Sequence, residues 1–404
     1  MNYLSAGTCF LDQPGGAERV AWDTAVAMRD RGHDVAIICP RKKPEDDHSA
    51  MSESHGMRIV RYNHPRLPNW HPRRGERAIQ AAADATRKWL GDRKWDVVHI
   101  HMPLTGAGVM SALGHGPRYI YTMHSPVVLE QKINWSHQGI SGRLKLALGL
   151  GRIKRLESDL LNKCAGIQTL SEFTRREVGR FHGLADQVTV VPHWRRSDLK
   201  RTHTKEQARR LLGWPENQKI LFTVRRHASR YGLDIAIRAI TPLAVQGRCI
   251  FVLAGDGPLR PSFEALAKEL GGDGNVRFTG RISDEELALS YEAADLFILP
   301  TTQLECFGLI TLEALAFGCP VLSTDSCALP ETMQPILPEF IVPAGDVGAL
   351  RQKVDDFLTG KLVPPPPEQL VEYLAERYDE SVVLPDLTKL LEGEPRPKQL
   401  VPSS

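Results

Sequence analysis

Short apolar segments alternate with amphipathic segments along most of this chain. The apolar segments are continuous runs rich in Val, Ile and Leu, such as DVAIIC at 34–39 and IFVLA at 250–254. Parallel strands that are covered on both faces have this pattern. The predicted strands are 1–5, 34–39, 58–61, 96–101, 119–122, 166–170 and 188–191, and then 220–224, 250–254, 276–279, 295–299, 321–323 and 340–342. Predicted helices between them include 17–31, 206–212, 234–244, 261–270, 284–293 and 309–317. This alternation predicts an α/β fold in which a doubly wound parallel sheet is built twice.

The length of the chain favours two domains. Its 404 residues, 42% of them hydrophobic, exceed the roughly 250 to 300 residues at which a single core stops growing. We expect two Rossmann-like domains, 1–193 and 194–364, facing each other across a cleft. The PPPP run at 364–367 ends the second domain, and a helical segment over 365–392 is expected to pack back toward the first. A flexible tail is expected at 393–404.

Cysteine content and hydropathy limit the cellular compartments in which the protein is expected. The seven cysteines include no CxxC pair and are odd in number, which disfavours a disulfide framework and a zinc site. The N-terminus lacks a signal-peptide pattern, and no apolar run approaches the ~18 residues of a membrane span. The sequence therefore predicts a cytoplasmic protein, at most peripheral to the inner face of a membrane.

Charge is distributed unevenly between the two halves. The whole chain carries +3, but residues 1–193 hold 27 Lys and Arg against 19 Asp and Glu, a net +8, and residues 194–404 hold 24 against 29, a net −5. Two interpretations stay open for the basic half: contact with an anionic membrane surface or acceptor, or surface charge without a function. No nucleic-acid partner is expected.

The most informative segment is LECFGLITLEALAFG at 304–318, which contains two glutamates. The GCP sequence at its end predicts the stop of a helix that begins near Gly308. Glu305 then lies in the preceding loop, and Glu313 lies about a turn and a half inside the helix. A helix N-terminus binds phosphate, and glycine lets a ligand approach the backbone closely. Because phosphate repels a carboxylate, we expect both glutamates to accept hydrogen bonds from uncharged hydroxyls, those of a sugar for Glu305 and of a ribose for Glu313.

Three further segments fall at the predicted carboxyl ends of strands in the second domain, where open α/β sheets bind ligands. TVRRHASRYG supplies Arg225, Arg226 and Arg230 as cations for a pyrophosphate and for the charge on a leaving nucleotide. The turns AGDGP and FTGRIS are weaker signals. They supply Gly255, Arg281 and Ile282 as candidates to border a donor nucleotide.

The first predicted strand and helix are joined by QPGGAERV at 13–20. Gly15 and Gly16 open a helix N-terminus where phosphate or sugar can touch backbone N–H groups. The segment is not GxGxxG, which disfavours dinucleotide binding of the dehydrogenase type.

Histidines occur at the ends of two other strands, in HIHMP at 99–103 and YTMHSP at 121–126. His99 and His101 point to the same face of a strand, so a metal pair is one interpretation. A structural role is favoured instead, because no third ligand has suitable spacing. We expect His124, just past its strand, to face the cleft.

In an ordered set of motifs, the chain resembles the retaining family 4 glycosyltransferases, which have the GT-B fold. The motifs are PGGAERV, DVVHIHMP, YTMHS, LSEFTRREV, VVPH, FTVRR, LAGDGP, VRFTGRISDEEL and ECFGLITLEALAFGCPVLSTD. The EX7E pattern of Glu305 and Glu313 is the most specific of them. The resemblance implies transfer of a hexosyl group from a nucleoside diphosphate sugar, with UDP favoured, to a hydroxyl of a sugar, natural product or glycolipid. It implies no cofactor and no metal.

The resemblance also implies roles for individual residues. Glu305 would bind hydroxyls of the donor hexose, Glu313 the ribose, and Arg226 the pyrophosphate. The remaining implied contacts are the backbone of Phe307, Gly308 and Leu309 on the sugar and phosphates, Gly16 on the opposite side of the donor, and His124 beside the reacting centre. The implied chemistry is same-face attack, in which the leaving phosphate helps to deprotonate the acceptor hydroxyl.

The chain departs from the family pattern in two places. The family usually has Gly-Arg followed by Lys-Gly, whereas here Arg225 replaces the glycine and Tyr231 stands at the position of the lysine. One phosphate-binding cation is therefore in question, and Arg230 is a candidate to replace it. The VPNG-type turn reads VPHW at 191–194, which predicts either a stiffer hinge or a tryptophan in the acceptor pocket.

The acceptor is the least defined part of the prediction. Candidate binding stretches are 63–77 and 127–155, and the second contains basic residues interleaved with leucines. This pattern suits a helix on a membrane surface or a helix packed on the domain core. Two other functions stay open: a nucleotide-sugar epimerase of the same fold, which would change the donor sugar unaided, and a nucleotide-sugar-binding protein without turnover, which would bind the donor even after loss of Glu305.

Overall fold

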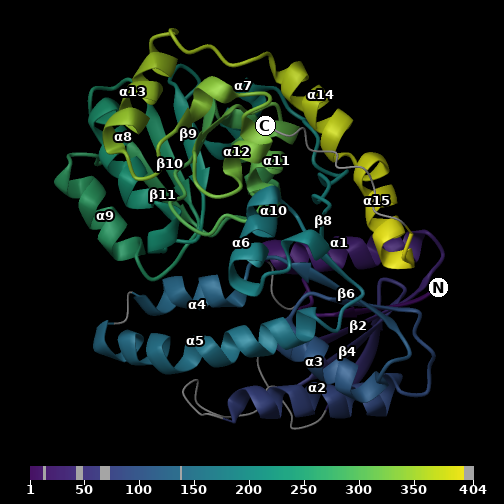
Figure 1. Cartoon of the computed structure of the whole chain (residues 1–404). Helices are drawn as coiled ribbons and strands as arrows, with labels where there is room; N and C mark the ends of the chain where they lie inside the picture. Colours follow the sequence, from purple (N-terminus) through teal and green to yellow (C-terminus); the bar gives the residue numbers. More distant parts are fainter. Residues whose placement is uncertain (12–14, 42–48, 64–72, 137–138, 395–404) are drawn as a thin grey trace. The chain divides into compact units, whose positions relative to one another are not determined.

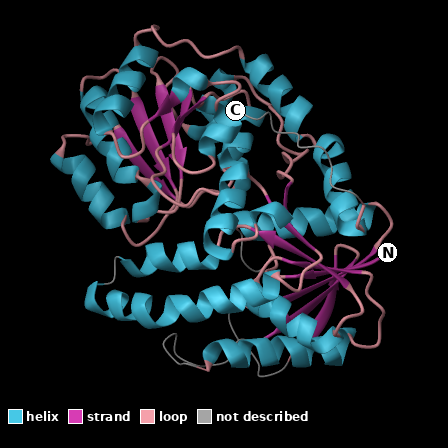
Figure 2. Ribbon diagram, viewed as in Figure 1, coloured by secondary structure: helices cyan, strands magenta, loops and turns pink. Residues whose placement is uncertain are grey.

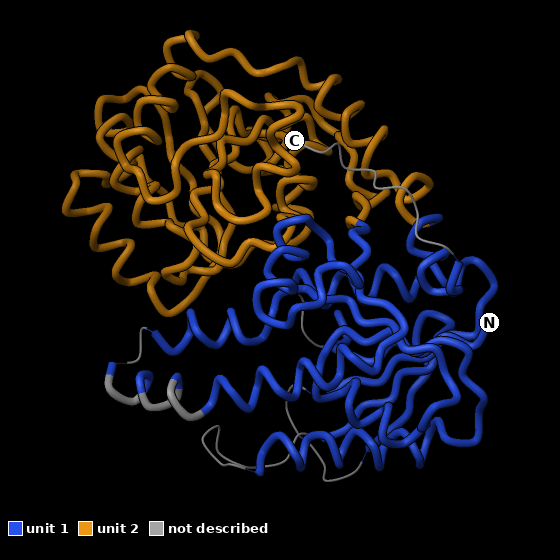
Figure 3. The backbone as a smooth tube through the Cα atoms, in the orientation of Figure 1, with its two compact units in different colours: residues 1–191, 385–404 blue, residues 192–384 orange. Residues whose placement is uncertain are grey.

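The computed structural model describes residues 1–11, 15–41, 49–63, 73–136 and 139–394 (Figure 1). Most of the first candidate acceptor stretch, 63–77, and most of the expected tail, 393–404, lie outside these residues. The chain forms two compact units (Figure 3). Unit 1 contains Met1–Val191 and the chain from Pro385, and unit 2 contains Pro192–Leu384.

The described residues of unit 1 form a sheet of eight strands in the order β3-β4-β2-β1-β5-β6-β7-β8. The strands are β1 (Asn2–Ala6), β2 (Asp34–Pro40), β3 (Ala50–Ser54), β4 (Met57–Tyr62), β5 (Val97–Ile100), β6 (Arg118–Met123), β7 (Gly166–Thr169) and β8 (Val188–Val190). All neighbours pair in parallel except β3, which is antiparallel to β4. The sequence did not predict β3, because its residues AMSES are mostly exposed at the sheet edge and form no apolar run.

Helices connect these strands and cover both faces of the sheet (Figure 2). They are α1 (Gly16–Asp30), α2 (Arg74–Leu90), α3 (Pro103–Leu113), α4 (Val127–Ser136), α5 (Gly139–Leu161), α6 (Glu172–His182) and the short η1 (Ala185–Gln187). Buried aliphatic residues of the strands, such as Leu4, Val98 and Ile100, pack with Trp95 in one core cluster. The continuous apolar runs thus bury both faces of each central strand, as predicted.

The described residues of unit 2 form a fully parallel sheet of six strands in the order β11-β10-β9-β12-β13-β14. The strands are β9 (Ile220–Val224), β10 (Ile250–Ala254), β11 (Val276–Gly280), β12 (Leu296–Leu299), β13 (Val321–Thr324) and β14 (Ile341–Val342). The helices are α7 (Lys205–Leu212), α8 (Leu233–Val245), α9 (Arg260–Glu269), α10 (Asp284–Ala293), α11 (Leu309–Ala316), α12 (Leu329–Met333), α13 (Val347–Leu358) and α14 (Pro367–Tyr378), with short turns η2 (Ser229–Tyr231) and η3 (Pro338–Phe340). β9 pairs with both β10 and β12, so the loops after these strands meet at one edge of the sheet.

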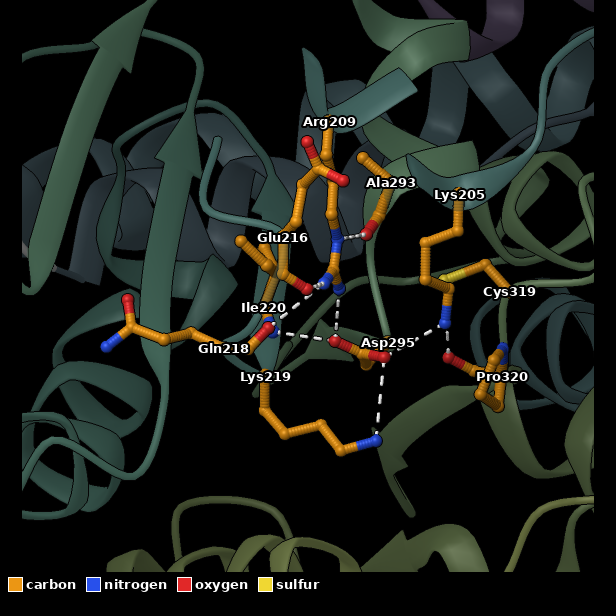
Figure 4. Close-up of polar contacts among 10 residues, drawn as sticks. All are labelled: Lys205, Arg209, Glu216, Gln218, Lys219, Ile220, Ala293, Asp295, Cys319 and Pro320. Atoms are coloured by element: carbon orange, nitrogen blue, oxygen red, sulfur yellow. Dashed lines mark hydrogen bonds and ion pairs between the residues drawn. The ribbon is translucent and has the colours of Figure 1, made fainter. Parts of the chain in front are cut away.

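A buried carboxylate fixes the opposite edge of the unit 2 sheet (Figure 4). Asp295, directly before β12, accepts hydrogen bonds from Arg209 Nη2 at 2.5 Å, from the Ile220 amide at 2.8 Å and from Lys205 Nζ at 2.9 Å. Arg209 also donates to the carbonyl oxygens of Ala293, Glu216 and Gln218. This network ties α7 to the amino ends of β9 and β12, away from the carboxyl ends that carry the candidate site.

The C-terminal segment forms two helices, α14 and α15 (Glu380–Glu392). α14 packs close to the end of α11, since a Cβ added to Gly318 would lie 2.6 Å from Cβ of Pro367. The second part of α15 belongs to unit 1, where Arg118 donates to the Leu390 carbonyl oxygen at 3.4 Å. Among the described residues, no helix has the length and apolar character needed to cross a bilayer.

Candidate functional site

The loop between β12 and α11 carries the two glutamates. α11 begins directly after Gly308, whose φ of 87° places it in the left-handed region that glycine tolerates best. Glu305 lies in the loop before the helix and Glu313 lies inside it, as the sequence predicted. Leu304 also has a positive φ, 57°, so the chain turns sharply on both sides of Glu305. Phe307 is buried, and Leu309 is the first residue of the helix.

Glu305 is held by an arginine from the neighbouring strand. Its Oε2 lies 2.6 Å from Nη2 of Arg225, and the two side chains are only 15% and 12% exposed. Arg225 Nη2 also donates to Thr301 Oγ1 at 3.3 Å. The parallel pairing of β9 with β12 brings these residues together, because Arg225 follows β9 and Glu305 follows β12. The carboxylate therefore has a fixed orientation without any ligand.

The three arginines after β9 have different environments. Arg225 binds Glu305, and Arg230 Nη2 donates to the Tyr231 hydroxyl at 2.6 Å. The Arg226 side chain is exposed and has no hydrogen bond or ion pair within the described part of the chain. Arg225 and Arg226 are adjacent in the chain but have different surroundings, so they do not act as a pair. Arg226 is the member of this set that remains available to an anion.

Tyr231, at the position where the family pattern has a lysine, contacts two guanidinium groups. The guanidinium carbons of Arg225 and Arg230 lie 5.2 Å and 4.7 Å from the centre of its ring. Both distances are in the range of cation–π interactions. The departure from the family pattern thus produces a cluster of two arginines around one phenol ring.

Glu313 has separate neighbours. Its Oε2 accepts a hydrogen bond from the Tyr291 hydroxyl at 3.3 Å. Burial raises the pKa of Tyr291 well above its ordinary value, and the charge of Glu313 adds to this effect, so the phenol stays protonated and donates. Glu313 itself is half-buried on α11.

Glycines allow the loops after β9, β10 and β11 to approach one another. Gly255 has a φ of 104°, and a Cβ at this position would lie 2.0 Å from the Arg225 carbonyl oxygen. Its amide donates to the Gly280 carbonyl oxygen at 2.7 Å. Arg281 follows as an exposed residue, and Ile282 is half-buried. Gly255, Arg281 and Ile282 therefore lie on neighbouring loops at the same edge of the sheet as Arg225.

The predicted histidines of unit 1 are also neighbours. His101 Nδ1 and His124 Nε2 lie 3.1 Å apart, with their rings stacked at 5.3 Å between centroids. His99 and His101 do share a face, with ring centroids 4.2 Å apart. His99, however, has the Tyr3 hydroxyl 2.7 Å from Nδ1 and the Thr122 hydroxyl 2.5 Å from Nε2. Both ring nitrogens of His99 are thus occupied, which argues for a structural role.

Burial and the nearby charge of His124 lower the pKa of His99 to about 3, so this imidazole is neutral in the folded protein. Its position between Tyr3 and Thr122 explains the burial. Across the described residues, no group of three or more His, Cys, Asp or Glu side chains is arranged to hold a metal ion.

The α1 N-terminus differs from a simple anion site. The helix begins at Gly16, and Gly15 before it is extended, with φ −169°. A Cβ added to Gly15 would lie 2.5 Å from Oε2 of Glu18, so this carboxylate already approaches the N-terminal turn. Burial raises the pKa of Glu18. Sequence reasoning missed Glu18, although an acidic residue in the first helical turn is a common N-terminal signal.

Two Rossmann-like units, the second with Glu305 before and Glu313 inside a helix that follows a glycine, give this chain the GT-B fold of glycosyltransferases. Residues 14–195 match the family model described as Glycosyltransferase Family 4, and residues 204–377 match the one described as Glycosyl transferases group 1. The chain therefore belongs to the family 4 glycosyltransferases, and it is a sugar-transferring enzyme.

Several curated relatives are similar over most of the chain. The phosphatidyl-myo-inositol mannosyltransferase of Mycobacterium leprae is 26% identical over 393 residues, which cover 95% of this chain and 94% of the relative. The 2-deoxystreptamine glucosyltransferase of Streptomyces kanamyceticus is 27% identical over 335 residues, which cover 76% and 80%.

Solved structures show the same fold. Sucrose-phosphate synthase from Thermosynechococcus elongatus superposes with a TM-score of 0.79 at 20% identity, covering 96% of this chain and 98% of its own. HepE from Anabaena, solved in complex with UDP and glucose, superposes with a TM-score of 0.73 at 15% identity, covering 97% and 100%.

Proposed function

We propose that this enzyme transfers a hexosyl group from a nucleoside diphosphate sugar to an acceptor hydroxyl, with retention of configuration and without a metal ion. UDP is the favoured nucleotide, in line with the UDP and glucose bound by HepE. The names of two curated relatives, a mannosyltransferase and a glucosyltransferase, support a hexose.

The observation that carries this proposal is the arrangement around the start of α11. A helix N-terminus attracts phosphate, and Gly308, whose φ of 87° is one that glycine tolerates best, directly precedes this one. Glu305 lies three residues earlier with its charge balanced by Arg225. This arrangement suits a ligand that has a diphosphate next to several neutral hydroxyls, which is the structure of a sugar nucleotide.

Each side chain has a role in this reaction. Glu305 accepts hydrogen bonds from hexose hydroxyls, and Glu313, held by Tyr291, accepts them from the ribose. Arg226 stabilises the negative charge that grows on the leaving diphosphate, since fixed cations at a developing charge lower the barrier. The loops of Gly255, Arg281 and Ile282 border the nucleotide, and His124 belongs to the acceptor side.

The chemistry needs no enzymatic nucleophile. The acceptor oxygen forms a bond to the anomeric carbon on the face from which the diphosphate oxygen departs, and this gives retention. The proton of the acceptor hydroxyl passes to the departing phosphate oxygen. Positive charge from Arg226 and the α11 N-terminus takes the place of a metal, so we expect EDTA to leave the rate unchanged.

The acceptor is proposed to carry a hydroxyl on a small polyol or sugar, either free or attached to a lipid. The curated relatives are named for phosphatidyl-myo-inositol, a lipid whose head group is a cyclitol, and for 2-deoxystreptamine, an aminocyclitol, so both names indicate ring hydroxyls. Suitable probes are therefore myo-inositol, vesicles that contain phosphatidylinositol, and 2-deoxystreptamine.

The test begins with a thermal-shift screen of UDP-, GDP-, ADP- and dTDP-sugars and continues with transfer assays on the acceptors above. Replacing Glu305 with Gln should lower the transfer rate about 10- to 100-fold, because hydrogen bonds to a charged group contribute roughly 1.5 to 3 kcal/mol. The exposed Glu269, replaced with Gln, is the matched control. The anomeric configuration of the product, read by NMR, checks retention.

Three outcomes would contradict the proposal. Undiminished transfer by the Glu305 variant would remove Glu305 from the donor site. Conversion of the donor sugar without an acceptor would indicate an epimerase. Tight donor binding without a product on any acceptor would indicate a binding protein without turnover.

A further inference from the structure

We propose that Arg225 and Tyr231 form a positioning pair for Glu305: the Tyr231 ring fixes the Arg225 guanidinium, and Arg225 orients the Glu305 carboxylate toward the donor hexose. This inference rests on the proposed function and deepens it. It assigns a purpose to Arg225 and Tyr231, two of the positions at which the chain departs from its family pattern.

The first part of the argument is the contact between Arg225 and Glu305. At 2.6 Å, with both side chains largely buried, it is a charge-assisted hydrogen bond in a region of low solvent screening. Only Oε2 of Glu305 is engaged by Arg225. Within the described residues Oε1 has no protein donor, so it is the oxygen that the ligand can use.

The second part is the way in which Tyr231 holds Arg225. The centre of the Tyr231 ring lies 5.2 Å from the guanidinium carbon of Arg225 and 4.7 Å from that of Arg230, and its hydroxyl accepts a hydrogen bond from Arg230. Cation–π contacts are stronger when they are partly shielded from water, so this contact helps to hold the Arg225 guanidinium in place. A flexible lysine at position 231 would instead place a third positive charge beside two arginines.

The third part is the backbone connection between η2 and the loop of Glu305. The Arg230 carbonyl oxygen accepts hydrogen bonds from the amides of Thr302 and Gln303, at 2.9 Å and 3.2 Å. Gly232 follows η2 with a φ of 63°, and a Cβ there would lie 2.0 Å from the Pro300 carbonyl oxygen. The segment that carries Tyr231 therefore packs against the loop that leads to Glu305.

The pair also resolves an electrostatic conflict in the site. A carboxylate next to a helix N-terminus that binds a diphosphate experiences repulsion from the ligand. Arg225 balances the charge of Glu305, so the glutamate can bind hydroxyls close to the phosphates. Arg225 is then a positioning residue, and Arg226 is the cation that meets the diphosphate.

The experiment compares binding of a nucleotide sugar with binding of its nucleoside diphosphate, by calorimetry on the full chain. The probes are UDP-glucose and UDP, or GDP-mannose and GDP if the screen described above selects that pair. The ratio of the two dissociation constants measures the contribution of the hexose. A purely structural role would weaken both ligands equally and leave this ratio unchanged.

The variants are Arg225→Lys, Tyr231→Leu, their double mutant, and Tyr231→Phe. Arg225→Lys keeps the charge but removes the planar fork, so we expect the hexose contribution to fall about tenfold, a change of about 1.4 kcal/mol, while the nucleoside diphosphate binds as before. Tyr231→Leu should cause a similar fall, and Tyr231→Phe, which keeps the ring, should retain most of the contribution. The double mutant should lose no more than the larger single loss, because the two residues act in one unit.

Arg238→Lys is the matched control, since Arg238 is exposed on α8. Thermal unfolding of every variant distinguishes a local change from loss of the fold.

The outcomes separate this inference from the proposed function. If Glu305→Gln removes the hexose contribution but Arg225→Lys and Tyr231→Leu retain it, the positioning pair is wrong and the proposed function stands. Additive losses in the double mutant would also overturn the pair. If the unmodified enzyme binds none of the four classes of nucleotide sugar, the proposed function fails and the pair fails with it.

Discussion

Gly308 directly precedes α11, and adding a single methyl group there tests how tightly the start of this helix is packed. Replacing Gly308 with Ala adds a Cβ in a residue with φ 87°. That Cβ would lie 3.0 Å from Leu329 Cδ2 and 3.2 Å from Thr311 Oγ1. Leu329 and Thr311 are both fully buried, so neither side chain can move away easily. The substitution therefore combines backbone strain with overpacking.

The magnitude follows from these two contributions. The left-handed conformation costs a non-glycine residue about 1 to 2 kcal/mol. Overpacking in a close-packed core adds about 1 to 3 kcal/mol. We expect Gly308→Ala to lower the free energy of unfolding by about 2 to 4 kcal/mol. In a unit of this size, each kcal/mol lowers the melting temperature by roughly 2 to 4 °C.

Gly345→Ala is a control with nearly the same backbone conformation. Gly345 has a φ of 84°, but no atom lies within 4 Å of the added Cβ. In this variant only the backbone strain should lower the free energy of unfolding, by about 1 to 2 kcal/mol, and the enzyme should transfer sugar at the normal rate. Scanning calorimetry of both variants gives the difference in the unit 2 transition. Equal destabilisation would show that Leu329 and Thr311 do not restrict the start of α11, and normal transfer by Gly308→Ala would remove that start from the donor site.

Two further predictions concern pH and buried charge. The folded pKa of His99 is about 3, so its contribution to stability is present above the unfolded pKa near 6.5 and is lost as pH falls toward 3, at up to about 1.4 kcal/mol per pH unit. His99→Gln should flatten the pH dependence of unfolding between pH 6.5 and 5, and an unchanged slope would contradict the assignment. Burial raises the pKa of Asp295, but Lys205, the Ile220 amide and Arg209 have the larger combined effect and leave this pKa below its ordinary value. The stabilisation that ionised Asp295 provides is therefore present above pH ~4 and is lost as the pH falls below that value. Asp295→Asn leaves the buried Arg209 without its counter-charge and should lower the free energy of unfolding by about 3 to 5 kcal/mol, measured by thermal unfolding. Asp273→Asn, on the surface, is the control and should lower it by almost nothing. Equal losses of stability in the two variants would refute the argument.

Local patterns in the sequence predicted much of the fold. Continuous apolar runs identified the central parallel strands because burial on both faces leaves no polar positions. The glycine before α11 predicted the first residue of that helix correctly, and the GCP sequence after it predicted the last residue to within one position. The edge strand β3 escaped prediction, since a polar and exposed strand has no apolar pattern.

The contacts within the candidate site could not be predicted in the same way. Arg225 and Glu305 are 80 residues apart, and they meet because β9 lies beside β12, a fact of strand order that no local pattern contains. The bond between Tyr291 and Glu313 likewise depends on how α10 and α11 pack. The different surroundings of the adjacent Arg225 and Arg226 depend on the same strand order, so the sequence treated the two residues as one pair.

The division of the chain at Val191 and again at Pro385 means that the two units share two covalent connections. An N-terminal fragment that stops near Val191 would lack Leu390, whose Cδ1 would lie 3.1 Å from a Cβ at Gly166, and would lose the cap that this leucine forms over β7. No single proteolytic cut can therefore release unit 1 intact, because it is made of two separate segments of the chain, and an isolated first half would need the last helix supplied as a separate peptide to fold completely.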